Sequence, residues 1–385
     1  MNQPIFVKGT PADNGDILDF GNYVFSHDGN PTDFIRMVPK CYRQGNEVPD
    51  QHYLVKENDR IRAMIGSFPL TMQVLGESLS IAGIGTVSVH PYARGSGYMK
   101  KLMHWAQEEM QANNVDLSIL GGQRQRYEYF SYTPAGAATT FWLNSSNIRH
   151  HLRDLDCSGI TLRPIAREDT QALEKCRVLH ERQPLFLERS REKFYDILIS
   201  WNSQVLGIYQ GEEMTGYLIT TAGHDAINEL ETQEPQQMLL ALKAFFRDFG
   251  CKNLSVKAAA FETDKLELLT EFCESSSVGD SYNYAIFHFE PVVRALMRLK
   301  ASYAHLADGT FVLEIKGRET LEICVSQGVP TVSASQKPAD LSLDALHATR
   351  LLLSASMTPF VQTRLPAFAA SWFPLPIYVF RQDGI

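Results

Sequence analysis

One stretch, GIGTVSVHPYARGSGYMKKLMHWAQEEM at residues 83–110, constrains the fold more than any other part of this chain. Its first half mixes apolar and small residues and ends at Pro91, which is typical of a strand. A turn that contains Gly95 and Gly97 leads directly into the second half. Apolar residues there recur at helical spacing, at Met99, Leu102, Met103, Ala106 and Met110. The stretch therefore predicts a strand, a tight turn and an amphipathic helix.

Such a turn is suited to bind an anion. The first N–H groups of a helix have no intrahelical partner, and together with the helix dipole they can bind a pyrophosphate. Gly95 and Gly97 allow the backbone to approach a ligand more closely than a β-carbon would. The turn follows several strands instead of opening the chain, and no GK[ST] follows it, so neither a dinucleotide fingerprint nor a phosphate loop fits. Taken alone, RGSG before a helix also fits a tight connection that binds nothing.

The composition is that of a folded, soluble protein, with 44% hydrophobic and 21% charged residues. The net charge is -8 and Lys and Arg are dispersed, which argues against a nucleic-acid partner. The 6 cysteines lie far apart without zinc-ligand spacing, so we expect reduced thiols and no metal. No window approaches the roughly 18 apolar residues that cross a bilayer, and no secretory signal opens the sequence, so a cytoplasmic location is expected.

The order of expected elements indicates three domains, at residues 1–145, 146–288 and 289–385. In the first we expect a strand, a helix from Thr10 to about Phe25, an antiparallel meander and the stretch described above, with strands at residues 5–7, 52–56, 61–68, 71–75, 80–89 and 115–120 and a second helix at 98–113. From Ile160 the pattern partly restarts, with a strand pair at 203–209 and 214–221 and an amphipathic helix at 235–249. We interpret it as a degenerate second copy of the first domain.

The last quarter of the chain changes character. It shows a helix at 291–299, the paired alternating strands GTFVLEIKG and TLEICVSQG, and a helix over LSLDALHATRLLLS. These elements predict a small α+β domain.

The central stretch resembles motif A of the GNAT acetyltransferases, whose coenzyme A loop has the form [Q/R]xxGx[G/A]. Arg94 and Gly97 match this form, and Met99 stands where the family has a small residue. With the partial second copy and the closing domain, the chain resembles the Eis-like branch (enhanced intracellular survival). That resemblance implies an α+β / α/β architecture of tandem GNAT folds, with a mixed, largely antiparallel sheet, and a sterol-carrier-like C-terminal domain. It also implies a homo-oligomer, either a trimer or a hexamer.

A second match is GGQRQRYEYFSYTPAG, similar to an Eis-like segment in which a Tyr three residues before Phe-x-Tyr-x-Pro-Ala is the general acid. Tyr127 holds that position relative to Phe130, so the resemblance implies that it is the acid. Tyr129 and Tyr132 are assigned to packing, which is the usual role of aromatic residues in such a segment.

The resemblance implies that acetyl-CoA, the co-substrate, binds along a strand edge, the glycine turn and the segment after the next strand. In the fold that this resembles, two parallel strands splay apart, and the first can pair with the pantetheine amides like an added strand. The implied contact residues are Val87, Ser88, Val89, Gly95, Ser96, Gly97, Tyr98, Met99, Lys100, Gly122 and Gln123.

Acyl transfer from a thioester to an amine needs a neutral amine, stabilisation of an oxyanion and a proton for the leaving thiolate. The resemblance implies that a backbone N–H of residues 87–89 polarises the carbonyl and that the C-terminal carboxylate, here on Ile385, is the base. With a reference pKa of about 3.5, this carboxylate would anchor the ammonium and relay its proton through water. Tyr127, with a reference pKa of about 10, is suited to protonate the thiolate. Asp383 is a further candidate for attracting a cationic substrate.

The expected activity is therefore acetyl transfer from acetyl-CoA to a primary amine. An aminoglycoside-like acceptor, another small amine and a protein lysine all remain open. The alternative is a lipid- or small-molecule-binding protein that uses the last domain and retains vestigial acetyltransferase lobes. An intact turn motif and Tyr127 weigh against that alternative.

Overall fold

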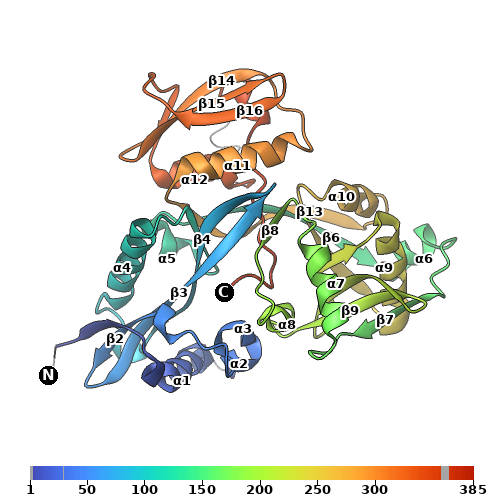
Figure 1. Ribbon diagram of the computed structural model, residues 1–385, viewed down its shortest axis with the longest axis horizontal. Helices are drawn as coiled ribbons and strands as arrows, with labels where there is room; N and C mark the ends of the chain where they lie inside the picture. The colour runs from blue at the N-terminus through green and yellow to red at the C-terminus, as the bar shows by residue number, and fades with distance from the viewer. Residues whose placement is uncertain (1–2, 29, 357–363) are drawn as a thin grey trace.

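The computed structural model describes residues 3–28, 30–356 and 364–385. Most strands belong to one 13-stranded mixed sheet in the order β1-β2-β3-β4-β5-β13-β6-β12-β11-β10-β9-β7, with β8 beside β3. A 4-stranded sheet in the order β16-β15-β14-β17 lies at one end of the molecule (Figure 1). The large sheet is built from β1 (Ile5–Lys8), β2 (His52–Glu57), β3 (Arg60–Val74), β4 (Glu77–Val89), β5 (Leu117–Leu120), β6 (Thr133–Asn144), β7 (Ile160–Pro164), β8 (Leu185–Leu187), β9 (Ser203–Gln210), β10 (Glu213–Thr221), β11 (Ala226–Thr232), β12 (Asn253–Ala259) and β13 (Ser275–Ile286). The small sheet is built from β14 (Gly309–Ile315), β15 (Glu319–Ser326), β16 (Val329–Ala334) and β17 (Leu341–Leu343).

Helices cover both sheets. The α-helices are α1 (Asn14–Phe25), α2 (Phe34–Met37), α3 (Pro39–Tyr42), α4 (Tyr98–Ala112), α5 (Arg124–Tyr127), α6 (Ser145–His151), α7 (Thr170–His180), α8 (Phe194–Leu198), α9 (Pro235–Phe249), α10 (Thr263–Thr270), α11 (Phe289–Ala301) and α12 (Ala345–Leu353). Short 3-10 helices are η1 (Pro11–Asp13), η2 (Ser26–Asp28), η3 (Pro49–Gln51), η4 (Pro91–Ala93), η5 (Glu128–Phe130) and η6 (Ala369–Ser371). Within the described ranges, none of these helices has the length and hydrophobicity that a bilayer crossing requires.

The two halves of the large sheet repeat one pairing scheme. From the β1 edge inward, neighbouring strands are antiparallel until β4 and β5, which are parallel, and β5 then pairs antiparallel with β13. From the β7 edge the senses are the same, with β11 and β12 as the parallel pair and β6 as the last strand. The halves thus exchange their last strands, because β6 follows β5 in the chain but pairs with β12.

This arrangement confirms the predicted mixed α+β fold with a second, smaller sheet. The β6–β13 pair joins the halves into one sheet, whose strands come from both sides of residue 145 in the sequence. The domain boundaries at 145/146 and 288/289 stay predictions, as does the sterol-carrier likeness of the last domain.

Two predicted element boundaries were wrong. Residues 61–68 and 71–75 were expected as separate strands, but β3 continues through Pro69. Thr71 accepts a hydrogen bond from the Glu188 N–H, so Pro69, two residues earlier, faces the same side, where β2 has already ended. The helix expected from residue 341 begins only at Ala345, because Asp344 caps it and residues 341–343 pair with β14 as a strand.

The first half of the large sheet is covered on both faces. Leu102, Met103 and Ala106 of α4 are fully buried against one face of β2, β3 and β4. Ile17 and Phe20 of α1 pack with the alternate residues of the same strands on the opposite face. The glycine turn at residues 94–97 therefore lies at the α4 face, and the helices of residues 14–42 lie over the other.

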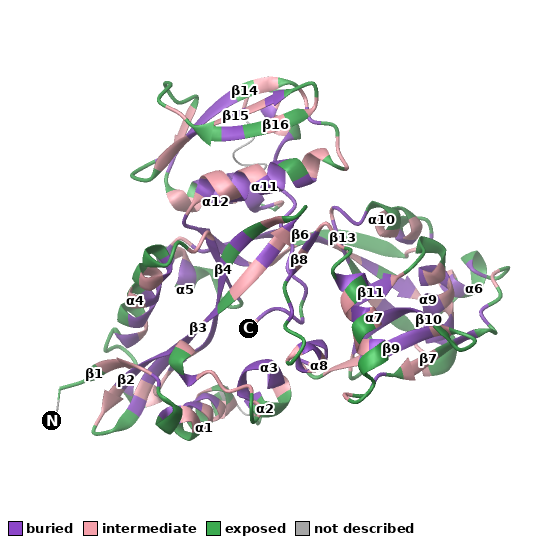
Figure 2. Cartoon of the chain, viewed as in Figure 1, coloured by how far each residue is buried: buried purple, intermediate pink, exposed green. Residues whose placement is uncertain are grey.

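The small sheet packs on α11 and α12, and the chain then leaves this domain. Its last residues run into the middle of the molecule, between the two halves of the large sheet (Figure 1). They are largely buried there (Figure 2). The C-terminal residue is thereby placed far from its own domain and beside β4.

Candidate active site

The candidate site begins where β4 and β5 separate. The two strands pair from Ile81 opposite Leu117 to Ile84 opposite Leu120, and the recorded pairing ends there, while β4 continues beside β3 to Val89. The gap is the splay that the resemblance implied. It leaves the end of β4 with an edge that no β5 residue covers.

A β-bulge at Thr86 turns the end of β4. The register with β3 shifts between Met64 and Gly66, and Thr86 has φ 48°. A β-branched residue in the left-handed region is strained, and such residues persist where the surrounding structure over-determines them. Bulges re-aim the residues that follow them. Here the residues that follow are the predicted cofactor contacts.

The open edge of β4 presents main-chain donors. The His90 N–H donates to the Arg62 carbonyl at 2.8 Å and so faces β3. Because peptide groups alternate along a strand, the N–H groups of Val89 and Val87 face the gap. The Ser88 hydroxyl donates to the Thr86 carbonyl at 3.0 Å and is buried. The Ser88 side chain is therefore turned away from the gap, and its N–H, like that of His90, faces β3.

The glycine turn is open to an approaching ligand. Gly95 has φ 85° and Gly97 has φ 73°, both in the left-handed region that glycine tolerates best. A β-carbon at either position would meet no atom of the described chain within 4 Å. Space of this kind above a turn is what a phosphate group would occupy, so the turn fits a pyrophosphate.

The beginning of α4 supplies further donors. Its first backbone bond runs from the Lys101 N–H to the Gly97 carbonyl at 3.2 Å, so the three preceding N–H groups, of residues 98–100, point out of the helix end. The Ser96 N–H donates to the Ala93 carbonyl at 3.3 Å and closes the turn. Met99 packs against the same core as Val87 and Val89, which explains how a long side chain is accommodated there.

Tyr127 and its aromatic neighbours have distinct environments. Tyr127 is 7% exposed, and its hydroxyl makes no hydrogen bond to any other described residue. Burial raises its pKa above the usual value of 10.0, although Arg126 lowers it in part, so the hydroxyl is protonated at neutral pH. Tyr132 is buried and donates to the Ser118 hydroxyl at 2.7 Å. Tyr129 is 86% exposed, so its assignment to packing was wrong.

A cavity of about 390 Å³ brings part of the predicted site together. Val87, Gly122, Gln123, Tyr127 and Ile385 all line it, although they come from three separate parts of the chain. The other predicted cofactor contacts, Ser88, Val89 and residues 95–100, lie beyond the cavity, along the end of β4 and at the start of α4. The predicted residues thus form two neighbouring groups, one in the cavity and one at the helix terminus.

Ile385 packs directly on the backbone of β4. A β-carbon on Gly85 would lie 2.4 Å from Ile385 Cγ2, and one on Gly83 would lie 2.9 Å from Cγ1. Contacts this close are possible only because both positions are glycine. The GIG sequence before the turn is therefore explained by the docking of Ile385.

Two polar side chains hold the backbone just before Ile385. Lys40 Nζ donates to the carbonyls of Gln382 at 2.6 Å and Gly384 at 2.8 Å, and Trp201 Nε1 donates to the Gly384 carbonyl at 3.1 Å. Lys40 is fully enclosed, and burial lowers its pKa to about 8. Residues from both halves of the sheet thus hold the same short segment.

A buried ion-pair network anchors Asp383. Arg189 donates to Asp383 at 2.7 and 2.9 Å and to Glu229 at 3.0 and 2.8 Å. Burial alone would raise the pKa of Glu229, but Arg189 holds it well below its usual range. Asp383 is 4% exposed and fully engaged, so the expectation that it attracts a cationic substrate was wrong. No spacing pattern in the sequence marks Lys40, Trp201 or Arg189, because they meet the tail only through the tertiary fold.

A chain of polar side chains leads from the bulge into the core. The Tyr42 hydroxyl donates to Thr86 Oγ1 at 3.0 Å and lies 3.1 Å from His52 Nε2, while His52 Nδ1 lies 3.0 Å from the Val48 carbonyl. Burial lowers the pKa of His52 to about 4, so the imidazole is neutral at pH 7. These contacts hold Thr86 in its strained conformation.

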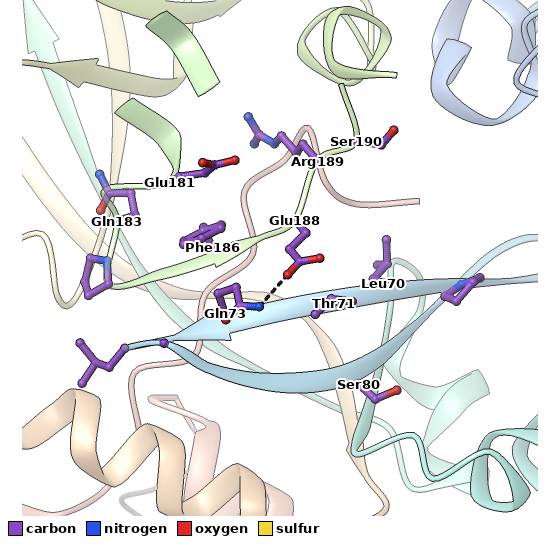
Figure 3. A pocket seen from close by; sticks show the side chains of 14 residues that line it. Leu70, Thr71, Gln73, Ser80, Glu181, Gln183, Phe186, Glu188, Arg189 and Ser190 are labelled. Carbon is purple, nitrogen blue, oxygen red and sulfur yellow. Dashed lines mark hydrogen bonds between the residues drawn. The ribbon is translucent and has the colours of Figure 1, made fainter. Parts of the chain in front are cut away.

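A larger cavity, of about 880 Å³, lies elsewhere, between β3 and the segment that carries β8 (Figure 3). Gln73 Nε2 donates to Glu188 Oε1 across it at 2.6 Å. None of the predicted site residues lines this cavity. We place the candidate site in the smaller cavity, since only there do the open strand edge and Tyr127 meet.

Comparisons with known proteins identify similar domains and folds. Residues 8–135 match the model of the acetyltransferase (GNAT) domain family. A search of curated proteins gave no match. Among solved structures, a conserved protein of unknown function from Enterococcus faecalis V583, described as a probable N-acyltransferase, is 16% identical with a TM-score of 0.71, and 100% of each chain is covered.

Two further structures are similar over the whole chain. The GCN5-related N-acetyltransferase from Kribbella flavida is 15% identical with a TM-score of 0.70, covering 100% of this chain and 98% of the other. Eis1 from Mycobacterium abscessus is 12% identical with a TM-score of 0.69, covering 100% of both chains. At these identities the likeness establishes the fold. Residues 8–135 thus match the model of the GNAT acetyltransferase domain, and the whole chain shares its fold with these three proteins.

Proposed function

We propose that this protein transfers the acetyl group of acetyl-CoA to a primary amine. One observation carries the proposal: Tyr127 and Ile385, from distant parts of the chain, line one cavity at the gap between β4 and β5. A GNAT domain match over residues 8–135 supports the same chemistry.

The residues at the gap and the turn fit a coenzyme A thioester. The N–H groups of Val87 and Val89 are suited to pair with pantetheine amides, and the helix terminus at residues 95–100 is suited to a pyrophosphate. Gly122 and Gln123 would close the other side of the gap, since they follow β5 and line the cavity. Arg94 and Lys100 are exposed beside the turn and add positive charge toward phosphates. When bound, acetyl-CoA supplies the activated acetyl group.

Three groups of this chain would perform the chemistry. A backbone N–H at Val87 would donate a hydrogen bond to the carbonyl oxygen on which negative charge develops. The Tyr127 hydroxyl, protonated at neutral pH, would donate its proton to the leaving sulfur. The carboxylate of Ile385 would accept a hydrogen bond from the incoming ammonium and relay its proton through water. Lys40, Trp201 and Arg189 would hold this carboxylate in place through the residues before it.

The test combines cofactor binding with turnover. Acetyl-CoA is titrated calorimetrically, and thiol release is then followed with a panel that includes simple amines, an aminoglycoside and a lysine peptide. We expect binding and amine-dependent thiol release. Binding without release for any amine, together with uptake of a fluorescent fatty acid, would instead favour the lipid-carrier alternative. The predicted trimer or hexamer is tested separately, by the mass of the protein in solution.

A further inference from the structure

One part of the cavity wall is largely aromatic. It is formed by Phe25, Phe34 and Met37 of the first helices, by Tyr42 and by Trp201. The rings are already packed on one another, since the Phe25 and Phe34 centroids lie 5.1 Å apart and those of Phe34 and Tyr42 lie 5.2 Å apart. Phe34 is 4% exposed, whereas Phe25 is 43% exposed at the rim. The wall is therefore preformed and apolar.

Acidic side chains do not contribute to this cavity. Among the described residues that line it there is no Asp or Glu, and Arg126 is the one cationic side chain. Arg126 forms no ion pair with any residue that the structure describes. Asp383, two residues before Ile385, is engaged with Arg189, and the exposed Asp33 beside Phe34 accepts the Arg36 N–H as a helix cap. The Ile385 carboxylate is left as the anionic group that meets an acceptor.

This charge distribution selects between the classes of amine. An ammonium that loses water without a carboxylate or hydrogen-bond partner is costly, and each additional one adds to that cost. A single ammonium at the Ile385 carboxylate is compensated, and the aromatic wall favours both a cation and an apolar body. The cavity of about 390 Å³ must also hold the thioester end of the acetyl donor, which leaves little room for a large acceptor.

We propose that the acceptor is a small amine that carries one cationic group on an aromatic or apolar body, and that polycationic amines such as aminoglycosides are disfavoured. The proposal rests on the proposed acetyltransferase function. It names the class of substrate that the same cavity takes.

The first test compares three acceptors at pH 7.5 by acetyl-CoA-dependent thiol release. We expect kcat/KM for 2-phenylethylamine to exceed that for kanamycin by about 10²-fold or more, because kanamycin would leave ammonium groups uncompensated. The kcat/KM for 2-phenylethylamine should also exceed the kcat/KM for ethylamine by about tenfold, because ethylamine lacks the ring that contacts the wall. An equal or higher kcat/KM for kanamycin would overturn the proposal and leave the acetyltransferase function standing.

The second test adds a negative charge to the cavity wall. Phe25→Glu places a carboxylate at the rim of the wall, and we expect it to narrow the preference for 2-phenylethylamine over kanamycin by about tenfold. Tyr23→Glu is the matched control, since Tyr23 lies on the same helix, is 48% exposed and does not line the cavity. Equal changes in both variants would overturn the proposal. If none of the amines gives thiol release, the acetyltransferase function itself is overturned, and the substrate class with it.

Discussion

At Gly97 the left-handed backbone and the open space above it serve two different purposes. The conformation begins the helix, whereas the space admits a ligand. We expect Gly97→Val to weaken acetyl-CoA binding by about tenfold or more, because a branched side chain fills that space. Calorimetric titration of the folded variant measures the effect.

The control for Gly97→Val separates strain from obstruction. Gly250 has φ 61°, also in the left-handed region, and a β-carbon there would likewise meet no described atom within 4 Å. Gly250→Val should therefore cost a similar amount of stability, about 1–2 kcal/mol, without changing cofactor affinity. Unchanged affinity in folded Gly97→Val would remove the assignment of the turn.

Tyr127→Phe removes the hydroxyl and keeps the ring. If this hydroxyl protonates the leaving thiolate, kcat should fall by about 10²-fold or more while the Kd for acetyl-CoA stays nearly the same. Tyr129→Phe should have no effect, because that side chain is 86% exposed. Tyr132→Phe should lower stability by about 1 kcal/mol through the lost bond to Ser118 and leave kcat near the wild-type value. Similar losses in all three would point to packing instead of acid catalysis.

His52 makes the stability of the first half of the large sheet sensitive to acid. Its pKa falls from 6.5 to about 4 on folding, because burial disfavours the charged imidazole. The unfolded chain therefore binds more protons between these values, so the stabilisation is complete above pH 6.5 and is lost as the pH falls toward 4. Between pH 7 and pH 5 the loss is about 2 kcal/mol. Urea denaturation at both pH values measures it, and in His52→Gln this part of the difference should disappear. A wild-type protein with no greater acid sensitivity than the variant would show that His52 is not buried as described.

At the scale of the elements, the contact between β4 and the C-terminal residue gives a testable prediction for turnover. Gly85→Ala places a methyl group where Ile385 Cγ2 now lies, so Ile385 must move and turnover should fall by about tenfold. Ile385→Ala removes the obstructing atoms and should restore part of the activity when the two changes are combined. Gly279→Ala is the control, because a β-carbon at Gly279 meets nothing within 4 Å. Additive losses of kcat/KM in the double variant would mean that the two residues do not interact.

At the scale of the whole molecule, the site depends on a segment that crosses from the last domain. Ile385 lies inside the cavity, held by Lys40 and Trp201 through the preceding carbonyl. Adding a few residues after Ile385 should displace its carboxylate and abolish acetyl transfer. Acetyl-CoA binding should survive, because residues 95–100 are untouched. The same extension before Met1 should be tolerated, because β1 lies at the edge of the sheet. Full activity in a folded, C-terminally extended protein would leave the base to water or to another carboxylate.

The sequence pattern predicted those helices and turns whose formation depends on residues close together in the chain. The period of apolar residues predicted α4 and α9 almost to their ends, and Gly95 and Gly97 marked a turn that does adopt left-handed conformations. A prediction failed where the effect of a residue type depended on the position of a distant strand. Pro69 lies within β3 because its missing N–H faces a side without a partner strand, and no sequence pattern shows which strand ends where.

The sequence by itself determined the mixed fold class and the glycine turn, because the helices, strands and turn follow from residues close together in the chain; the role of Tyr127 stays a prediction. Tertiary structure alone decided the exchange of β6 and β13 between the halves, the burial of Asp383 against Arg189 and the aromatic, acid-free wall of the cavity. Each of these joins residues that are far apart in the chain, and a side chain's charge and exposure depend on which distant groups pack around it.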